Sequence, residues 1–145
     1  MINNVFLSVQ IKNKKNMSLR SKTLELLRKR EQYLQGGGEK AIEKQLSMGK
    51  LAARERVLSI LDKDSFQEYD LFVEHEARDF DMSSKVLYGD GVITGTGTIF
   101  GSPVCIFAQD FTVAGGSLGL MHARKITKIM DHALKLRIPL IGIND

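Results

Sequence analysis

The chain has 145 residues, 43% of them hydrophobic and 26% charged, which is the composition of an ordinary globular protein with room for one modest core. Its net charge of +4 is small, and the sequence has no tryptophan and no nucleic-acid-binding motif, so we expect no nucleic-acid partner. No apolar run approaches the ~18 residues of a membrane-spanning helix, so we also expect no direct membrane segment.

The first region is residues 1–17, whose charged side chains are all basic. This composition weakly suggests a transit peptide, but the apolar residues are too interrupted for the hydrophobic core of a secretory signal. A helix can begin at Ser18 with the serine as its N-cap. We therefore interpret residues 1–17 as a disordered arm, or as the result of a start codon placed too far upstream.

Residues 18–65 form a second region, a helical arm. The spacing of apolar residues predicts helices over residues 18–35, 39–48 and 52–61. Gly36, Gly37 and Gly38 end the first helix, because three glycines cannot sustain it. On the third helix, one face is expected to carry Val57, Leu58 and Leu61. Because the apolar stripes are narrow, we expect the arm to pack on a partner domain or subunit.

An acidic segment follows the helical arm. Residues 66–75 alternate apolar and acidic side chains in a strand-like or turn-like pattern, and residues 74–81 add further carboxylates beside His75. Carboxylates with one imidazole could hold a divalent cation, but this spacing specifies no coordination geometry. The pattern favours a solvated acidic loop, so we predict no metal site.

Two strands are predicted next. Residues 89–101 contain apolar pairs separated by small residues, and Gly101-Ser102-Pro103 forms a turn into the apolar run 104–108. An antiparallel hairpin is the simplest interpretation. The only cysteine, Cys105, lies in the second strand and is expected to be a buried, reduced thiol. A single cysteine allows no disulfide within the chain, which favours a cytoplasmic location over an oxidising one.

The glycine-rich turn after this hairpin carries the strongest functional signal. Gly115 and Gly116 allow positive φ and close approach of a ligand to the backbone, and Ser117 is the expected N-cap of a helix over 118–136. Unpaired amides at a helix N-terminus can receive a phosphate or an acyl-thioester. An ordinary strand-to-helix turn explains the same residues. A second strand over 138–143 would complete a ββα unit.

The helix over 118–136 is expected to be amphipathic. Its predicted core face carries Met121, Ile126, Ile129, Met130, Ala133 and Leu134. Its predicted outer face carries Lys125, Lys128, Lys135 and Arg137. Two histidines, His122 and His132, lie ten residues apart and point in different directions, so they cannot share a metal, and each is expected to be a packed or surface imidazole.

Residues 36–82, 89–99, 107–134 and 141–145 resemble the N-terminal region of biotin-dependent acyl-CoA carboxyltransferases. The similarity is greatest to propionyl-CoA carboxylase β subunits and methylmalonyl-CoA decarboxylase α subunits, and it spans about residues 18–145. It implies an α/β, crotonase-like fold, in which ββα units repeat in a superhelix. Residues 66–145 would then be the first part of the carboxyltransferase N-terminal domain, with the helical arm before it.

The resemblance also implies an activity, namely transfer of a carboxyl group between carboxybiotin and propionyl-CoA or a similar short acyl-CoA. Biotin carboxylase and a biotin carboxyl carrier would be the partners, and the family forms oligomers, commonly hexamers. Alternatives are the α subunit of a sodium-pumping methylmalonyl-CoA decarboxylase, or a non-catalytic relic or assembly module. The family implies a cytoplasmic location, with the mitochondrial matrix less favoured.

Enolate formation at the thioester needs oxyanion stabilisation by oriented amides. In the family, a Gly-Gly-Ala-Arg stretch supplies such amides directly after the pair that matches Asn144-Asp145. The resemblance therefore implies that residues 1–145 contain no catalytic residue, bind no cofactor alone and are inactive by themselves. The last strand, residues 138–143, is expected to lack a covering helix and to expose an apolar edge.

The candidate site residues come from the resemblance. Phe111, Gly115, Gly116 and Ser117 would line the CoA pocket, and Lys50 and Arg54 would contact the CoA phosphates, since both side chains pair well with phosphate. A salt bridge along the helical arm explains Arg54 equally well. Where many relatives carry His, Thr, Cys and Phe, this chain has Leu46, Ala52, Ala77 and Ala114. The change at Ala114 leaves the preferred acyl-CoA open.

Overall fold

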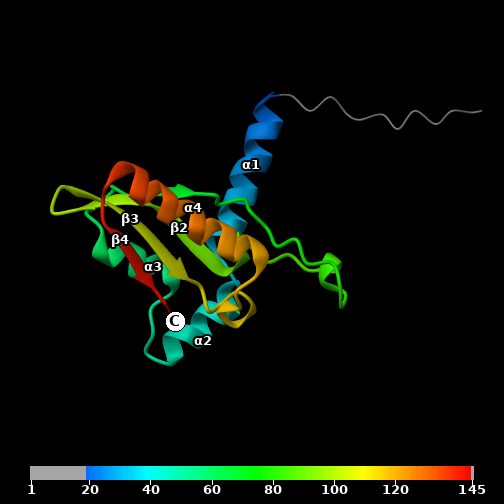
Figure 1. The fold of residues 1–145 in the computed structure, drawn as a ribbon. Coiled ribbons are helices and arrows are strands. Elements are labelled where there is room, and N and C mark those ends of the chain that lie inside the picture. Colours follow the sequence, from blue (N-terminus) through cyan, green and yellow to red (C-terminus); the bar gives the residue numbers. More distant parts are fainter. Residues whose placement is uncertain (1–18, 145) are drawn as a thin grey trace, which may run out of the picture.

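A four-stranded sheet with helices on both faces forms the body of the protein (Figure 1), in a computed structural model that describes residues 19–144. The helices are α1 (Leu19–Leu34), α2 (Glu39–Ser47), α3 (Ala53–Ile60) and α4 (Leu120–Leu136). The strands are β1 (Gln67–Tyr69), β2 (Val92–Ile99), β3 (Ser102–Gln109) and β4 (Leu140–Ile143). Three 3-10 turns are η1 (Met82–Ser84), η2 (Gly89–Gly91) and η3 (Ala114–Gly116). The predictions for residues 1–17 and for Ser18 as an N-cap lie outside the described residues.

The sheet has the strand order β1-β2-β3-β4. β1, β2 and β3 are antiparallel, whereas β4 runs parallel to β3 after the crossover through α4. The predicted ββα unit is therefore confirmed. In the hairpin, Ile99 pairs with Ser102, so the turn is Phe100-Gly101 and not the predicted Gly101–Pro103. Both turn residues have positive φ, 49° and 76°, which suits the right-handed twist of the strands.

Side chains alternate along the strands and build a core on each face of the sheet. Towards α3, the buried cluster contains Ala53, Val57, Leu61, Ile93, Val104, Ile106 and Ala108. Towards α4, it contains Cys105, Ile129 and Ala133, with Phe107 and Leu140 packed against them. The prediction for Cys105 is confirmed: its thiol is free and fully buried, and burial raises its pKa. It packs as a small hydrophobe.

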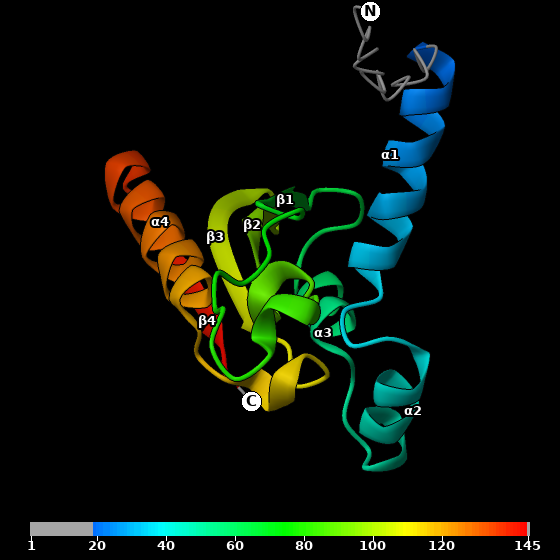
Figure 2. The same cartoon turned by 90° about the vertical axis from the view of Figure 1, so that its right-hand side faces the viewer.

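The third helix differs from its sequence prediction. We expected the helical arm to pack on a partner domain or subunit, and α3 does pack against the sheet that follows it in the same chain. Only part of the expected apolar face is used, because Val57 is 0% exposed while Leu58 is 52% exposed. By contrast, α1 projects away from the sheet and has no buried residue (Figure 2). For α1, packing on a partner stays a prediction.

The buried stripe of α4 also differs from the prediction. It is formed by His122, Lys125, Ile129 and Ala133. Met130 is exposed, Leu134 is 77% exposed, and Lys125, expected on the outer face, is only 3% exposed. The predicted core set covers a wider arc of the helix than the sheet can contact, and a lysine can bury its stem where its ammonium finds acceptors. His122 is fully buried, as a packed imidazole, and burial lowers its pKa.

The last strand is partly covered. β4 is half-buried, with Ile141 and Ile143 packed towards the α3 side and Leu140 packed towards the α4 side. The expectation that this strand lacks a covering helix stays a prediction. Among residues 19–144, no strand pairs with the outer edge of β4, so that edge is where the described sheet ends.

Candidate functional site

The segment between β3 and α4, residues 110–119, is called here the β3–α4 loop. It contains four predicted site residues, Phe111, Gly115, Gly116 and Ser117, and three of them are exposed at its surface, as Gly116 is half-buried. Ala114, Gly115 and Gly116 have positive φ of 49°, 64° and 70°. Glycine adopts this left-handed conformation easily, which explains Gly115 and Gly116 at this turn. Approach of a ligand to the loop backbone stays a prediction.

The start of α4 is not capped as predicted. The helix begins at Leu120, with Gly119 as N-cap, and the Ser117 hydroxyl instead donates to the Ala114 carbonyl at 2.7 Å. The cap comes from another part of the chain, since the His122 amide donates to the Asp90 carboxylate at 2.8 Å. A carboxylate already occupies this helix N-terminus, so a phosphate has less to gain there.

Lys50 and Phe111 are brought together although 61 positions separate them in the sequence. The Lys50 ammonium lies 5.7 Å from the centre of the Phe111 ring, within the range of a cation–π contact. Lys50 lies between α2 and α3 and is exposed. Its contact with Phe111 places its ammonium beside the β3–α4 loop. The fold thus supplies a cation next to the exposed backbone of the loop.

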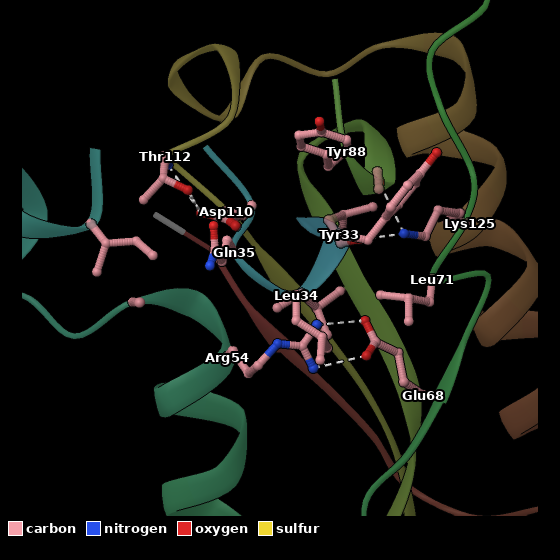
Figure 3. A pocket seen from close by; sticks show the side chains of 16 residues that line it. Tyr33, Leu34, Gln35, Arg54, Glu68, Leu71, Tyr88, Asp110, Thr112 and Lys125 are labelled. Carbon is pink, nitrogen blue, oxygen red and sulfur yellow. Dashed lines mark hydrogen bonds and ion pairs between the residues drawn. The ribbon is translucent and has the colours of Figure 1, made fainter. Parts of the chain in front are cut away.

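Arg54 lies apart from this pair. Its guanidinium donates to both Glu68 carboxylate oxygens, at 2.8 and 2.9 Å, in a bidentate pair (Figure 3). Arg54 is thus in a salt bridge, but its partner is in β1, so the predicted location of that salt bridge along the helical arm is wrong. The pair is mostly buried, and such charge-assisted bonds are among the stronger ones in proteins.

Arg54 and Glu68 line a small internal cavity together with Tyr33, Tyr88 and Lys125 (Figure 3). Its volume is about 30 Å³, enough for one or two waters and far too small for a nucleotide. The Lys125 ammonium donates to the carbonyls of Gly89, at 2.9 Å, and Val92. Burial is the main reason that the Lys125 pKa falls to about 8. This cavity is structural.

Gly36 and Gly37 pack directly against the β3–α4 loop, a contact that the sequence prediction missed. A Cβ on Gly37 would lie 1.8 Å from the Thr112 carbonyl oxygen, and a Cβ on Gly36 would lie 2.4 Å from the Asp110 carboxylate. The Gly37 amide donates to the Thr112 hydroxyl at 3.0 Å. The glycines thus end α1, and their lack of side chains also leaves room for the β3–α4 loop to pack against them. A run of three was the available signal, since one glycine suffices to end a helix.

A larger groove, about 780 Å³, lies between β1 and α4. It is lined by charges of both signs: Glu68, Asp70, Asp131, Arg124, Lys125, Lys128 and Lys135. Several are already paired, for example Lys128 with Asp70 at 2.7 Å. A lining of mixed sign offers a polyanion no clear attraction, so we do not place CoA there.

The acidic segment does not gather ligands. Among residues 19–144, no three histidine, cysteine, aspartate or glutamate side chains lie close enough to hold a metal ion. The His75 ring is bonded to the Lys85 carbonyl at 2.8 Å instead. Within the same residues, no helix is both long and apolar enough to cross a membrane.

The fold and the loop define a class of protein, and comparison with known families identifies it. The model of the carboxyl transferase domain matches residues 44–145. The chain therefore belongs to the carboxyl transferase family, as the resemblance predicted.

Particular relatives are similar over most of the chain. The propionyl-CoA carboxylase beta chain of Roseobacter denitrificans is 54% identical over 110 residues, which are 76% of this chain and 22% of that protein. The methylmalonyl-CoA decarboxylase subunit alpha of Veillonella parvula gives the same identity and coverage. The acetyl-/propionyl-coenzyme A carboxylase beta5 subunit of Mycobacterium tuberculosis is 51% identical over 124 residues, 86% of this chain and 23% of that protein. The chain thus spans about a quarter of these relatives.

Solved structures agree on the fold. Transcarboxylase 12S, with methylmalonyl-coenzyme A and methylmalonic acid bound, superposes with a TM-score of 0.85 at 40% identity, over 87% of this chain and 25% of that one. A single-chain, multi-domain long-chain acyl-CoA carboxylase superposes with a TM-score of 0.78 at 22% identity, over 86% and 14%. The second likeness shows the fold alone. The predicted crotonase-like carboxyltransferase fold is confirmed.

Proposed function

We propose that this chain is part of the carboxyltransferase subunit of a biotin-dependent acyl-CoA carboxylase, which transfers a carboxyl group between carboxybiotin and propionyl-CoA or a similar short acyl-CoA. The observation that carries the proposal is the exposed β3–α4 loop beside Lys50, in a chain 40% identical to a transcarboxylase that binds methylmalonyl-coenzyme A. Carboxybiotin would arrive on a biotin carboxyl carrier, loaded by a biotin carboxylase. We also propose an oligomeric subunit, because transcarboxylase 12S is a hexamer.

In this proposal the chain binds and orients the substrate. The loop backbone at Gly115 and Gly116 would approach the acyl-CoA, and Phe111 would offer it an apolar surface. Lys50 would pair with a CoA phosphate, because its exposed ammonium lies beside the β3–α4 loop. Arg54 lies apart from that loop, in a bidentate pair with Glu68, so we give Lys50 the first place. The resemblance assigns the enolate-stabilising amides to a Gly-Gly-Ala-Arg stretch, and for residues 19–144 we propose binding and orienting roles.

A methylmalonyl-CoA decarboxylase α subunit is the second candidate. The relative with that name is as similar to this chain as the propionyl-CoA carboxylase beta chain of Roseobacter, 54% identical in both cases. Both reactions move a carboxyl group between biotin and the same kind of thioester. A reducing, cytoplasmic compartment suits either, because Cys105 is a free thiol.

Binding tests the proposal first. Titration of the 145-residue chain with propionyl-CoA should give a specific complex, and Lys50→Ala should weaken it about tenfold, the effect of one lost charge-assisted bond. Arg54→Ala should lower stability and leave affinity within about twofold. Equal affinity of wild type and Lys50→Ala would remove Lys50 from the site. Absence of any complex would count against a CoA-binding role and would favour the non-catalytic assembly module.

Turnover tests the reaction. A complete carboxyltransferase subunit that contains this chain should be supplied with biotin carboxylase, a biotinylated carrier, ATP, labelled bicarbonate and propionyl-CoA, and the acid-stable label should be counted. Label in methylmalonyl-CoA would support the carboxylase. Loss of carboxyl from methylmalonyl-CoA onto free biotin, without net carboxylation of propionyl-CoA, would favour the decarboxylase.

A further inference from the structure

The buried turn η2, Gly89–Gly91, contacts both ends of the β3–α4 loop. At the start of the loop, the Asp110 amide donates to the Gly91 carbonyl at 2.7 Å. At its end, the Asp90 carboxylate accepts the His122 amide at 2.8 Å and lies against Gly119. One short turn thus spans the ten residues that contain the proposed CoA-binding backbone.

Asp90 is held in this position by its burial, by its backbone conformation and by contacts of Lys125 with the same turn. It is 3% exposed and adopts a left-handed conformation, with φ 47° and ψ 40°, which an aspartate tolerates better than most residues. Lys125 donates to the carbonyls of Gly89 and Val92, on either side of Asp90. Its ammonium also provides a positive charge near the buried carboxylate. The turn therefore cannot move without breaking several buried bonds.

Gly119 leaves the space that the Asp90 carboxylate needs at the N-terminus of α4. Its φ is −83°, a conformation that any residue adopts, so its backbone does not require glycine. Space does: a Cβ there would lie 2.6 Å from one Asp90 oxygen and 3.0 Å from the other. An alanine at this position would push the carboxylate off the helix N-terminus.

We propose that Asp90 is a positioning residue, which holds the β3–α4 loop in the geometry that receives acyl-CoA by capping α4 from another segment of the chain. The inference rests on the proposed function of the loop. Binding groups must be held to within fractions of an ångström to be effective, and residues outside the contact surface usually do this. Asp90 touches no ligand in this proposal, because it is buried beneath the loop.

The test measures the loop and the ligand separately in the 145-residue chain. Asp90→Ala should accelerate hydrogen exchange of the His122 amide at least about tenfold, because its acceptor is gone. It should also weaken propionyl-CoA binding about tenfold and diminish the NMR shifts that the ligand induces at the Gly115 and Gly116 amides. Asp90→Asn keeps an oxygen acceptor and should restore most of both. Gly119→Ala should reproduce the Asp90→Ala result with the aspartate still present.

Asp62→Ala is the matched control. The Asp62 carboxylate also accepts backbone amides, those of Phe100 at 3.0 Å and Gly101 at 2.8 Å, but it does so at the hairpin turn. This variant should lower the melting temperature while leaving affinity within about twofold. If Asp62→Ala weakens binding as much as Asp90→Ala, the effect is general instability and the proposal is wrong.

The two proposals fail in different ways. Wild-type chain that binds no propionyl-CoA contradicts the proposed function, while faster His122 exchange in Asp90→Ala would still support the clamp on the loop. Normal binding by Asp90→Ala and Gly119→Ala contradicts the positioning role and leaves the proposed function standing. Should Asp90→Ala fail to fold, Asp90→Asn and Gly119→Ala decide the question alone.

Discussion

Lys125 shows how a single residue can contradict its helical pattern. It lies among basic residues that face solvent, yet its ammonium is buried and donates to the carbonyls of Gly89 in η2 and Val92 in β2. Burial favours the neutral amine and is the largest influence on its pKa, which falls to about 8, while Glu68, Asp70 and Asp90 oppose the fall. The methylene stem fills apolar space, while the ammonium donates to both carbonyls.

This buried amine predicts an unusual pH dependence of stability. Between about pH 8 and pH 10.5, the unfolded chain carries a proton on Lys125 that the folded chain has lost, so stability should rise with pH across that window. Relative to Lys125→Met, which removes the titration, the wild-type free energy of unfolding should increase by about 2 kcal/mol from pH 7.5 to pH 9.5. Denaturant titrations of both proteins at both pH values measure it. Parallel curves would show that Lys125 is not buried.

At the scale of elements, α3 shows that only contact with the sheet decides which side of a helix is buried. Val57 and Leu58 are neighbours of similar apolarity, and both are expected on the core face. The crossing of α3 over β3 buries the first completely and leaves the second half exposed. Burial of apolar area is the main favourable contribution to folding, so the two positions should differ strongly in sensitivity.

Truncation of each side chain makes this difference measurable. Val57→Ala should lower the free energy of unfolding by about 2 kcal/mol, because it leaves a cavity between α3 and the sheet. Leu58→Ala removes more atoms but should cost less than about 0.5 kcal/mol, since those atoms already face solvent. Chemical denaturation of the two variants gives both values. A larger loss at Leu58 would mean that another surface covers α3.

At the scale of the whole molecule, the described residues leave large apolar side chains exposed on two sides. Along α1 these are Leu19, Leu24, Leu26 and Leu27, and at or near α4 they are Leu118, Leu120, Met130, Leu134 and Leu136. Exposed apolar residues of this number, together with the open edge of β4, are typical of surfaces that another protein surface covers. The oligomeric subunit that we propose would cover them.

The purified 145-residue chain should therefore bind an apolar dye and self-associate. We expect a mass above 16.2 kDa by sedimentation at micromolar concentration, together with enhanced fluorescence of anilinonaphthalene sulfonate. Leu134→Glu, on the exposed face of α4, should reduce both without lowering the melting temperature by more than a few degrees. A wild-type chain that stays monomeric, folds cooperatively and binds no dye would contradict this prediction.

Local patterns in the sequence predict most of the elements of this protein. The hairpin around Cys105, the amphipathic helix after Ser117 and the last strand follow from residue period and glycine placement, which act over a few residues. The motifs of the loop and of the helical arm also predict the family. The Arg54 ion pair was predicted as one of two alternatives, because a charge in a helix shows that it needs a partner but does not show which one.

Which side chains come into contact follows from the packing of distant segments. Asp90 caps a helix that begins 30 residues later in the chain. Gly37 packs against Thr112, and the Lys50 ammonium contacts the Phe111 ring. Each contact joins segments that no local sequence pattern relates. Ser117 was predicted as the N-cap of α4 because capping residues usually lie directly before the helix. In the structure the buried Asp90 carboxylate accepts the His122 amide instead. The helices, the strands and the family could be predicted from local patterns, since those patterns depend on neighbouring residues. The crossing of α3 and α4 over the sheet determined the site, since it depends on residues far apart in the chain.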